Sequence, residues 1–211
     1  MPRTFGAVSV ICLLAAAVLA AAPAPQARKG RAPAGKTSTS VDVTCPTELG
    51  KGVKSKREFC DIAIGTDPAT GIVMRVPPHT GTSTLLFDLH NRFAVSGATL
   101  PFANASALVA VLNGNNGKII ERAAVAGELR KELDLFDRIA GGGPGENKTV
   151  AAGRAQSVKV TVPAAVTSVC IVGVRLELTT KDGRSEFTTP GRPVAIGSNF
   201  RIEYTPAAVK K

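Results

Sequence analysis

From Val41 onward, apolar and polar residues alternate in short runs that end at glycine, proline, asparagine or aspartate. Alternation with a period of two is typical of half-buried β-strands, and residues 157–162 show it, with three valines separated by Lys159 and Thr161. The predicted strands are 41–44, 59–65, 71–76, 83–93, 107–113, 118–126, 157–162, 169–180, 185–188 and 194–204. Asn113–Gly117 joins two of these runs with residues that tolerate positive φ, so we expect a hairpin there. The pattern predicts a mainly β fold: a single antiparallel β-sandwich, immunoglobulin-like or jelly-roll-like, over residues 41–206.

One segment departs from the β pattern. Its apolar residues recur with helical spacing, at Leu129, Leu133, Phe136 and Ile139. A glycine-rich run, residues 141–145, follows and would end a helix. We therefore expect one short helix near residues 128–139, covering an open end or edge of the sandwich.

Residues 1–22 have the three-part pattern of a secretory signal peptide. Arg3 supplies the positive charge, Phe5–Leu19 is an uncharged apolar run, and three alanines follow. We expect an exported protein, periplasmic or extracellular, with a disordered Pro/Ala/Gly-rich basic linker at 23–40 and a basic tail at 207–211. No later stretch reaches about 18 consecutive apolar residues, so no integral membrane segment is expected once the signal is removed.

Removal of the signal would leave three cysteines. In an oxidising compartment Cys45 and Cys60 are the natural pair, and we expect a disulfide between them. Cys170 lies in an apolar run and, on a regular strand, shares a face with Val172 and Leu176. It is therefore expected to be a buried, inert thiol, the alternatives being a nucleophile or an intermolecular bridge.

The formal charge of +10 is concentrated near the start of the chain. Between Arg28 and Arg57 there are eight basic residues and two acidic ones, whereas the rest of the domain is close to neutral. The candidate contacts with an anionic surface are Lys51, Lys54, Lys56, Arg57 and the basic residues of the linker. The partner would be an anionic envelope or polysaccharide surface, the alternative being a tether with no partner. No nucleic-acid partner is expected, because no stacking aromatics accompany these charges.

A row of polar residues is the other candidate site. On a strand, Asp88, His90 and Arg92 would share one face, either as a binding or proton-handling surface or as a solvated sheet face. His79 follows two prolines and lies in a loop, and it could join His90 and Asp88 as a metal ligand. No spacing in the chain is diagnostic of a metal, so neither a metal nor a cofactor is expected.

No motif of hydrolase chemistry is present, and the chain has no tryptophan and one tyrosine. This composition argues against a sugar enzyme and against a sugar-binding module that stacks on aromatic rings. The leading hypothesis is an exported, non-catalytic β-sandwich that acts in binding or adhesion or as an envelope-associated structural module. The alternatives are a small secreted enzyme or metal-binding protein that uses the His79/Asp88/His90/Arg92 region, and a subunit that pairs through a sheet edge with another exported protein.

Overall fold

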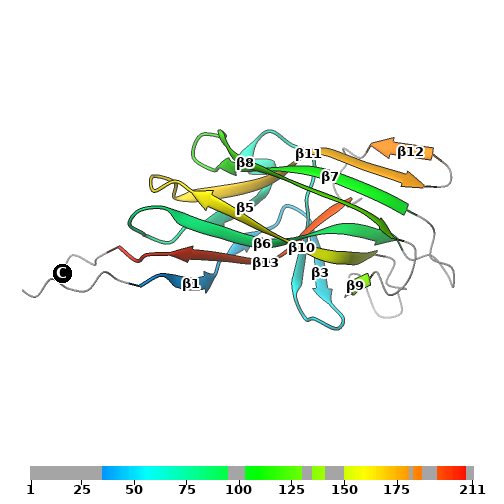
Figure 1. The fold of residues 1–211 in the computed structure, drawn as a ribbon, viewed down its shortest axis with the longest axis horizontal. Helices are drawn as coiled ribbons and strands as arrows, with labels where there is room; N and C mark the ends of the chain where they lie inside the picture. The colour runs from blue at the N-terminus through cyan, green and yellow to red at the C-terminus, as the bar shows by residue number, and fades with distance from the viewer. Residues whose placement is uncertain are drawn as a thin grey trace, which may run out of the picture. The chain divides into compact units, whose positions relative to one another are not determined.

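The computed structural model describes residues 35–94, 103–129, 135–140, 150–180, 183–186 and 194–207, which form two antiparallel sheets (Figure 1). The seven-stranded sheet has the order β1 (Thr37–Ser40), β13 (Ala195–Tyr204), β4 (Glu58–Asp61), β3 (Glu48–Gly52), β9 (Leu135–Ala140), β10 (Val150–Val162) and β6 (Ser83–Ala94). The six-stranded sheet has the order β2 (Val43–Thr44), β5 (Ile72–Arg75), β11 (Ser168–Thr180), β7 (Ala103–Asn113) and β8 (Ile119–Leu129), with β12 (Gly183–Glu186) paired to β11. The prediction of a mainly β, antiparallel protein is confirmed.

Helical structure is minimal in the described residues. A single 3₁₀ turn, η1 (Pro68–Thr70), begins after Asp67, whose side chain accepts a hydrogen bond from the backbone N–H of Ala69 at 2.9 Å. Within this part of the chain, no helix has the length and apolar character that crossing a membrane requires. The predicted Asn113–Gly117 hairpin is confirmed: Gly117 has φ +70° and donates to the carbonyl of Asn113, and β7 pairs with β8.

The seven-stranded sheet closes on itself. β13 pairs with β4 along one edge and with β6 along the other, so the path β13–β4–β3–β9–β10–β6 returns to β13. β1 continues the edge of β13 beyond β4, and Figure 1 shows β1 and β13 side by side. These strands therefore form a ring at one end of β13, whereas the six-stranded sheet remains open.

The main hydrophobic core is built from both sheets. Leu85 and Phe87 of β6 and Ile202 of β13 belong to the same cluster as Met74 of β5 and Val109 of β7. A second cluster is drawn only from strands of the ring, and its buried members are Phe59, Ile139, Ala152 and Ile196. Because one cluster lies on each side of it, β6 is covered on both faces.

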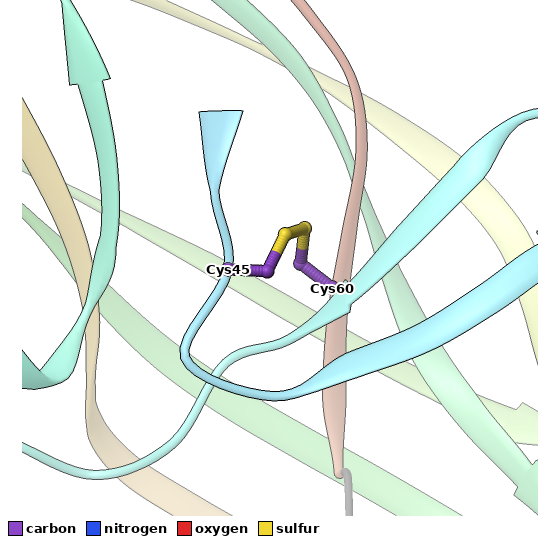
Figure 2. The surroundings of a disulfide bond; sticks show 2 residues. All are labelled: Cys45 and Cys60. Atoms are coloured by element: carbon purple, nitrogen blue, oxygen red, sulfur yellow. A yellow bond between two sulfur atoms is a disulfide. The ribbon is translucent and has the colours of Figure 1, made fainter. Parts of the chain in front are cut away.

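The predicted disulfide between Cys45 and Cys60 is confirmed, and it joins the two sheets (Figure 2). Cys45 directly follows β2 of the six-stranded sheet, and Cys60 lies in β4 of the seven-stranded sheet. Their Cα atoms are 5.7 Å apart. The bond is therefore a covalent link between the sheets, close to the start of the described chain.

The helix predicted near 128–139 is wrong where the structure describes it. Leu129 ends β8 and Leu135–Ala140 form β9, while residues 130–134 lie outside the described residues. β9 is hydrogen-bonded on both edges, to β10 and to β3. Its register with β10 shifts between Ala152 and Gly153, so that Phe136 has no residue opposite it. An irregular strand of this kind breaks strict alternation and imitates helical spacing.

The structure differs from two further expectations, which concern residues 37–40 and Cys170. Thr37–Ser40, which the sequence analysis assigned to the linker, form β1 against β13; residues 1–34 lie outside the described residues. Cys170 is buried as predicted, but on the other face of β11. The register of β11 with β7 shifts between Gly173 and Arg175, so Cys170 packs in a small separate cluster while Leu176 faces the main core. Burial raises the pKa of the Cys170 thiol to about 11.

Candidate functional site

The basic residues predicted to contact anions lie around the turn between β3 and β4. The turn closes through a hydrogen bond from the Gly52 N–H to the Arg57 carbonyl, at 2.8 Å, and one from the Lys56 N–H to the Gly52 carbonyl, at 3.1 Å. Lys56 has φ +59°, a left-handed conformation that is uncommon for a residue with a side chain. Lys54 and Lys56 are exposed at this turn.

Asp137 of β9 holds the turn in place. Its carboxylate accepts hydrogen bonds from the backbone N–H groups of Lys54, at 3.0 Å, and Ser55, at 2.7 Å. A Cβ atom at Gly52 would collide with this carboxylate, so the absence of a side chain there lets Asp137 approach. Burial would raise the pKa of Asp137, but hydrogen bonds from the Ser55 hydroxyl and from the backbone outweigh it and lower the pKa.

Arg57 is held by two contacts on the other side of the turn. Its Nη1 atom donates to Oδ2 of Asp88 at 2.8 Å, and its guanidinium lies over the ring of Phe136, 5.1 Å from the centroid. Asp88 also accepts hydrogen bonds from Ser157, at 2.9 Å, and from the side-chain amide of Asn199, at 3.0 Å. The structure thus brings together Arg57 and Asp88, which the sequence analysis assigned to separate candidate sites.

The four basic residues of this hairpin are not equivalent. Lys51 forms an exposed ion pair with Glu58 at 3.3 Å, and Arg57 is paired with Asp88. Lys56 donates from Nζ to the Val53 carbonyl at 2.8 Å, a contact with an uncharged group. Among the described residues, Lys54 and Lys56 make no ion pair, so these two carry the uncompensated charge of the turn.

His90 is inaccessible, with 0% of its surface exposed. Its Nδ1 atom lies 2.9 Å from the carbonyl of Gly153, which can only accept, so Nδ1 carries the proton of the neutral ring. Nε2 therefore accepts from the hydroxyl of Ser198 at 2.9 Å. The ring also packs against Phe59 and Phe136, with centroids 5.6 Å and 5.1 Å away. Burial lowers the pKa of His90, which favours the neutral imidazole.

The polar row predicted on β6 is therefore not a solvated face. Asp88 and His90 are both buried, because the closed ring covers the face that carries them. Ser198 and His90 have the spacing of a nucleophile and its base, but Ser198 is also 0% exposed, so a substrate has no access to the pair. Arg92 lies in β6 opposite Ala152, and its side chain lies outside the described residues.

His79 does not join His90. It forms an isolated bridge with Pro206, whereas His90 is opposite Ile196 of β13. The two partners are ten residues apart, which corresponds to roughly 30 Å of extended chain. No group of three His, Cys, Asp or Glu side chains within the described ranges is arranged to hold a metal ion.

A cleft of about 490 Å³ lies beside the basic turn and the disulfide. β3, β4 and residues of the segment from Ser40 to Cys45 line its sides, and Asn199, Phe200 and Arg201 of β13 contribute from the third side. Lys56 and Arg57 belong to its lining. Sequence reasoning missed Asn199, Arg201 and Asp137, because only the pairing of β13 and β9 with distant strands brings them to the basic turn. The single local signal was the predicted strand at 194–204, which contains Asn199 and Arg201.

No protein-family model matches the chain, and no curated protein matches it. Among solved structures, it is similar to the K1 cleaved adhesin domain of Lys-gingipain from Porphyromonas gingivalis W83, with a TM-score of 0.36 and 9% identity over 82% of this chain and 99% of that chain. It is also similar to the CBM22-1–GH10 modules of the endo-1,4-β-D-xylanase 10B of Clostridium thermocellum, with a TM-score of 0.28 and 10% identity over 84% of this chain and 27% of that chain. At TM-scores this low, the two likenesses do not bear on what this chain binds.

Proposed function

We propose that this chain is an exported, non-catalytic β-sandwich module that binds anionic polymers at a cell surface. The contacts would come from the exposed lysines of the β3–β4 turn and from the basic segment that precedes β1. The observation that carries the proposal is the turn itself: Lys54 and Lys56 are exposed without ion pairs, on a backbone that Asp137 fixes by two hydrogen bonds. A fixed backbone lowers the conformational entropy that binding must remove.

Lys51 and Arg57 would contribute less to polymer binding than the sequence suggested. Both are already neutralised by a carboxylate, Lys51 by Glu58 and Arg57 by Asp88. Their removal would free a negative charge as well as remove a positive one. Among the basic residues that the sequence analysis singled out, the charge available to a polymer is therefore that of Lys54, Lys56 and the preceding basic residues, among which Lys36 is exposed.

The absence of catalysis is part of the proposal, and the state of the two acid–base candidates supports it. His90 is fully buried and bonded through both ring nitrogens, and Asp88 is bonded to Arg57, Ser157 and Asn199. Groups with these partners have a structural role that accounts for their position. A general acid or base must instead reach a proton on the substrate.

The test is retention of the exported protein on immobilised polygalacturonate and dextran sulfate, with uncharged dextran as the reference. The test variant carries Lys54→Gln and Lys56→Asn, where asparagine tolerates the positive φ of Lys56. The matched control carries Lys118→Gln and Arg122→Gln, two exposed basic residues at the other sheet.

We expect the native protein and the control to be retained on both anionic polymers, to elute as salt rises, and to pass through dextran. The test variant should elute at clearly lower salt. Equal elution of the test variant and the control would show that the turn has no special part in binding. If the native protein passed through both anionic polymers without being retained, the proposed function would be overturned.

A further inference from the structure

We propose that the cleft between β1 and β4 binds the carboxylate or sulfate group of a single acidic sugar unit, with Arg201, Lys56 and Asn199 as its contacts. This inference rests on the proposed function and names the ligand of the same region. It differs from general attraction to a charged surface, because it requires one defined place where the anionic group is held.

The cleft exists because two strands share one edge of β13 and leave a gap between them. β4 pairs with β13 as far as Ser198, and β1 begins to pair with it at Arg201. Asn199 and Phe200 lie between and have no partner in either register. The register with β6 on the opposite edge also shifts between Ser198 and Arg201, and Asn199 has φ +55°. The irregularity places Asn199 and Phe200 in the lining of the cleft.

The polar groups of the cleft are fixed before a ligand arrives. Asn199 donates from its amide nitrogen to Asp88, and a second N–H of the same amide remains for another acceptor. Arg57 uses Nη1 to bond Asp88, and the guanidinium group has five N–H donors. Hydrogen-bond donors that are already held in place favour an oxyanion, since little side-chain freedom is lost when it binds.

The charge of the lining favours an anion and excludes the ends of this chain as occupants. Lys51 and Arg57 of the lining are paired with Glu58 and Asp88, which leaves the charges of Lys56 and Arg201 against that of Glu48. Within the described part of the chain, Arg201 forms no ion pair and is exposed. The sequence before β1 and the last two residues, Lys210 and Lys211, are basic and would be repelled.

The apolar part of the cleft determines how a sugar could be recognised. Val41, Val43 and Phe200 are among its lining residues, but Phe200 is only 8% exposed and offers no open ring face for stacking. Recognition must therefore depend on the charged group, with the aliphatic side chains contacting the C–H groups of the ring. A volume of about 490 Å³ lies within the roughly 300–1,000 Å³ typical of small-molecule sites.

The test is calorimetric titration of the exported protein with four probes: trigalacturonate, a monosulfated disaccharide, neutral galactotriose and inorganic sulfate. Two variants change the charge of the cleft in opposite directions. Arg201→Gln removes a positive contact, and Glu58→Gln removes a carboxylate that competes with the ligand and pairs with Lys51. Arg122→Gln, on β8 of the other sheet, is the control of equal charge to Arg201→Gln.

We expect one or both acidic saccharides to bind, Arg201→Gln to weaken that binding by about three- to tenfold, and Glu58→Gln to strengthen it. The control should bind as the native protein does, and galactotriose should not bind. Which acidic saccharide binds identifies the group as carboxylate or sulfate. Binding of inorganic sulfate as strong as that of the sulfated disaccharide would overturn the saccharide assignment.

The same variants separate this inference from the proposed function. If Arg201→Gln and Arg122→Gln bind the acidic probes equally while the native protein is still retained on anionic polymers, the cleft is not the site and the proposed function stands. If the native protein is not retained on any polymer yet binds an acidic saccharide in an Arg201-dependent manner, the cleft site stands and the proposed surface-binding function fails.

Discussion

Arg57 and Asp88 form their 2.8 Å ion pair across β13. Ser198 of β13 is opposite Asp88 on one edge and opposite Phe59, two residues after Arg57, on the other. The pair therefore connects β6 with the residue that directly precedes β4, and Arg57 also lines the cleft. The side chain of Arg57 is 38% exposed and that of Asp88 is 9% exposed. Loss of the ion pair would therefore leave the Asp88 carboxylate as a buried charge without a charged partner.

The first prediction concerns this pair. Arg57→Ala leaves the buried Asp88 carboxylate without its charged partner, and we expect the free energy of unfolding to fall by about 1–3 kcal/mol. Lys54→Gln, three residues away and exposed, should change it by less than about 0.5 kcal/mol. Urea unfolding at neutral pH measures both. Equal stability of the two variants would show that Ser157 and Asn199 suffice to hold Asp88.

A second prediction concerns Asp137. Asp137→Asn offers one carbonyl oxygen where the carboxylate offers two, so one of the backbone N–H groups of Lys54 and Ser55 loses its acceptor. We expect amide hydrogen exchange at one or both of these residues to become at least about tenfold faster, which corresponds to the loss of roughly 1.4 kcal/mol of local stability. The control is Asp42→Asn, an exposed carboxylate outside the turn. Unchanged exchange in Asp137→Asn would mean that pairing of β3 with β4 alone orders the turn.

The third prediction is a dependence of stability on pH. Burial, assisted by the charge of Arg57, lowers the pKa of His90 below its ordinary value of 6.5, against the opposing effects of Gly153 and Asp88. Below pH 6.5 the unfolded chain binds a proton at His90 that the folded chain does not. The free energy of unfolding should therefore fall as pH drops from 6.5 and should level off below the folded-state pKa.

Urea unfolding between about pH 7.5 and pH 5 measures this slope. The double variant His90→Phe/Ser198→Ala removes the titrating group together with the side chain hydrogen-bonded to its Nε2 atom, and it should lose the slope. His79→Gln should keep the slope, because His79 is bridged to Pro206, ten residues from Ile196, the residue opposite His90. If the slope disappears in His79→Gln and persists in the double variant, His90 is not the source of the pH dependence and the prediction is wrong.

The fourth prediction concerns the disulfide. Its cysteines are 15 residues apart, and the chain-entropy estimate for a loop of this size is about 3 kcal/mol. Cys45→Ala/Cys60→Ala should lower the free energy of unfolding by roughly that amount. A reductant should destabilise the native protein and leave the double variant unaffected. If reductant destabilised both proteins equally, its effect on stability would not come from reduction of the Cys45–Cys60 disulfide.

Local patterns were sufficient wherever a single face or a short loop determines the structure. Asn113–Gly117 was predicted because its residue types suit the turn. Cys45 and Cys60 were paired because export places them in an oxidising compartment, while Cys170 lies in an apolar run that predicts a buried thiol. For β6, the local pattern was not sufficient to predict burial. Alternation separates Leu85 and Phe87 from Asp88 and His90, but it does not show that the polar face is covered too. The closure of the ring covers it, and that closure depends on pairing between strands far apart in the chain.

β9 was missed for a related reason. Its backbone is held by β3 and β10, which are distant in sequence, and the shift at Phe136 removes the alternation that would have identified a strand. Asp137 likewise stands 83 positions from Lys54. The candidate site could therefore be predicted only as a group of basic residues. Which of them are neutralised, and that Arg201 and Asn199 join them, follows from the tertiary structure.

The disulfide between the sheets also bears on how the protein would respond to mechanical force. A pull on the segment before β1 would first peel β1 from β13, where only the pairs between residues 37–40 and 201–204 resist. The two pairs of β2 with β5 would separate next, and extension would then stop at Cys45, because the covalent bond passes the load directly to Cys60 in the ring. The ten Cα–Cα steps from Gly35 to Cys45 set that limit at roughly 35 Å. The load would thus reach the ring through Cys60 only after the cleft between β1 and β4 had lost its β1 side.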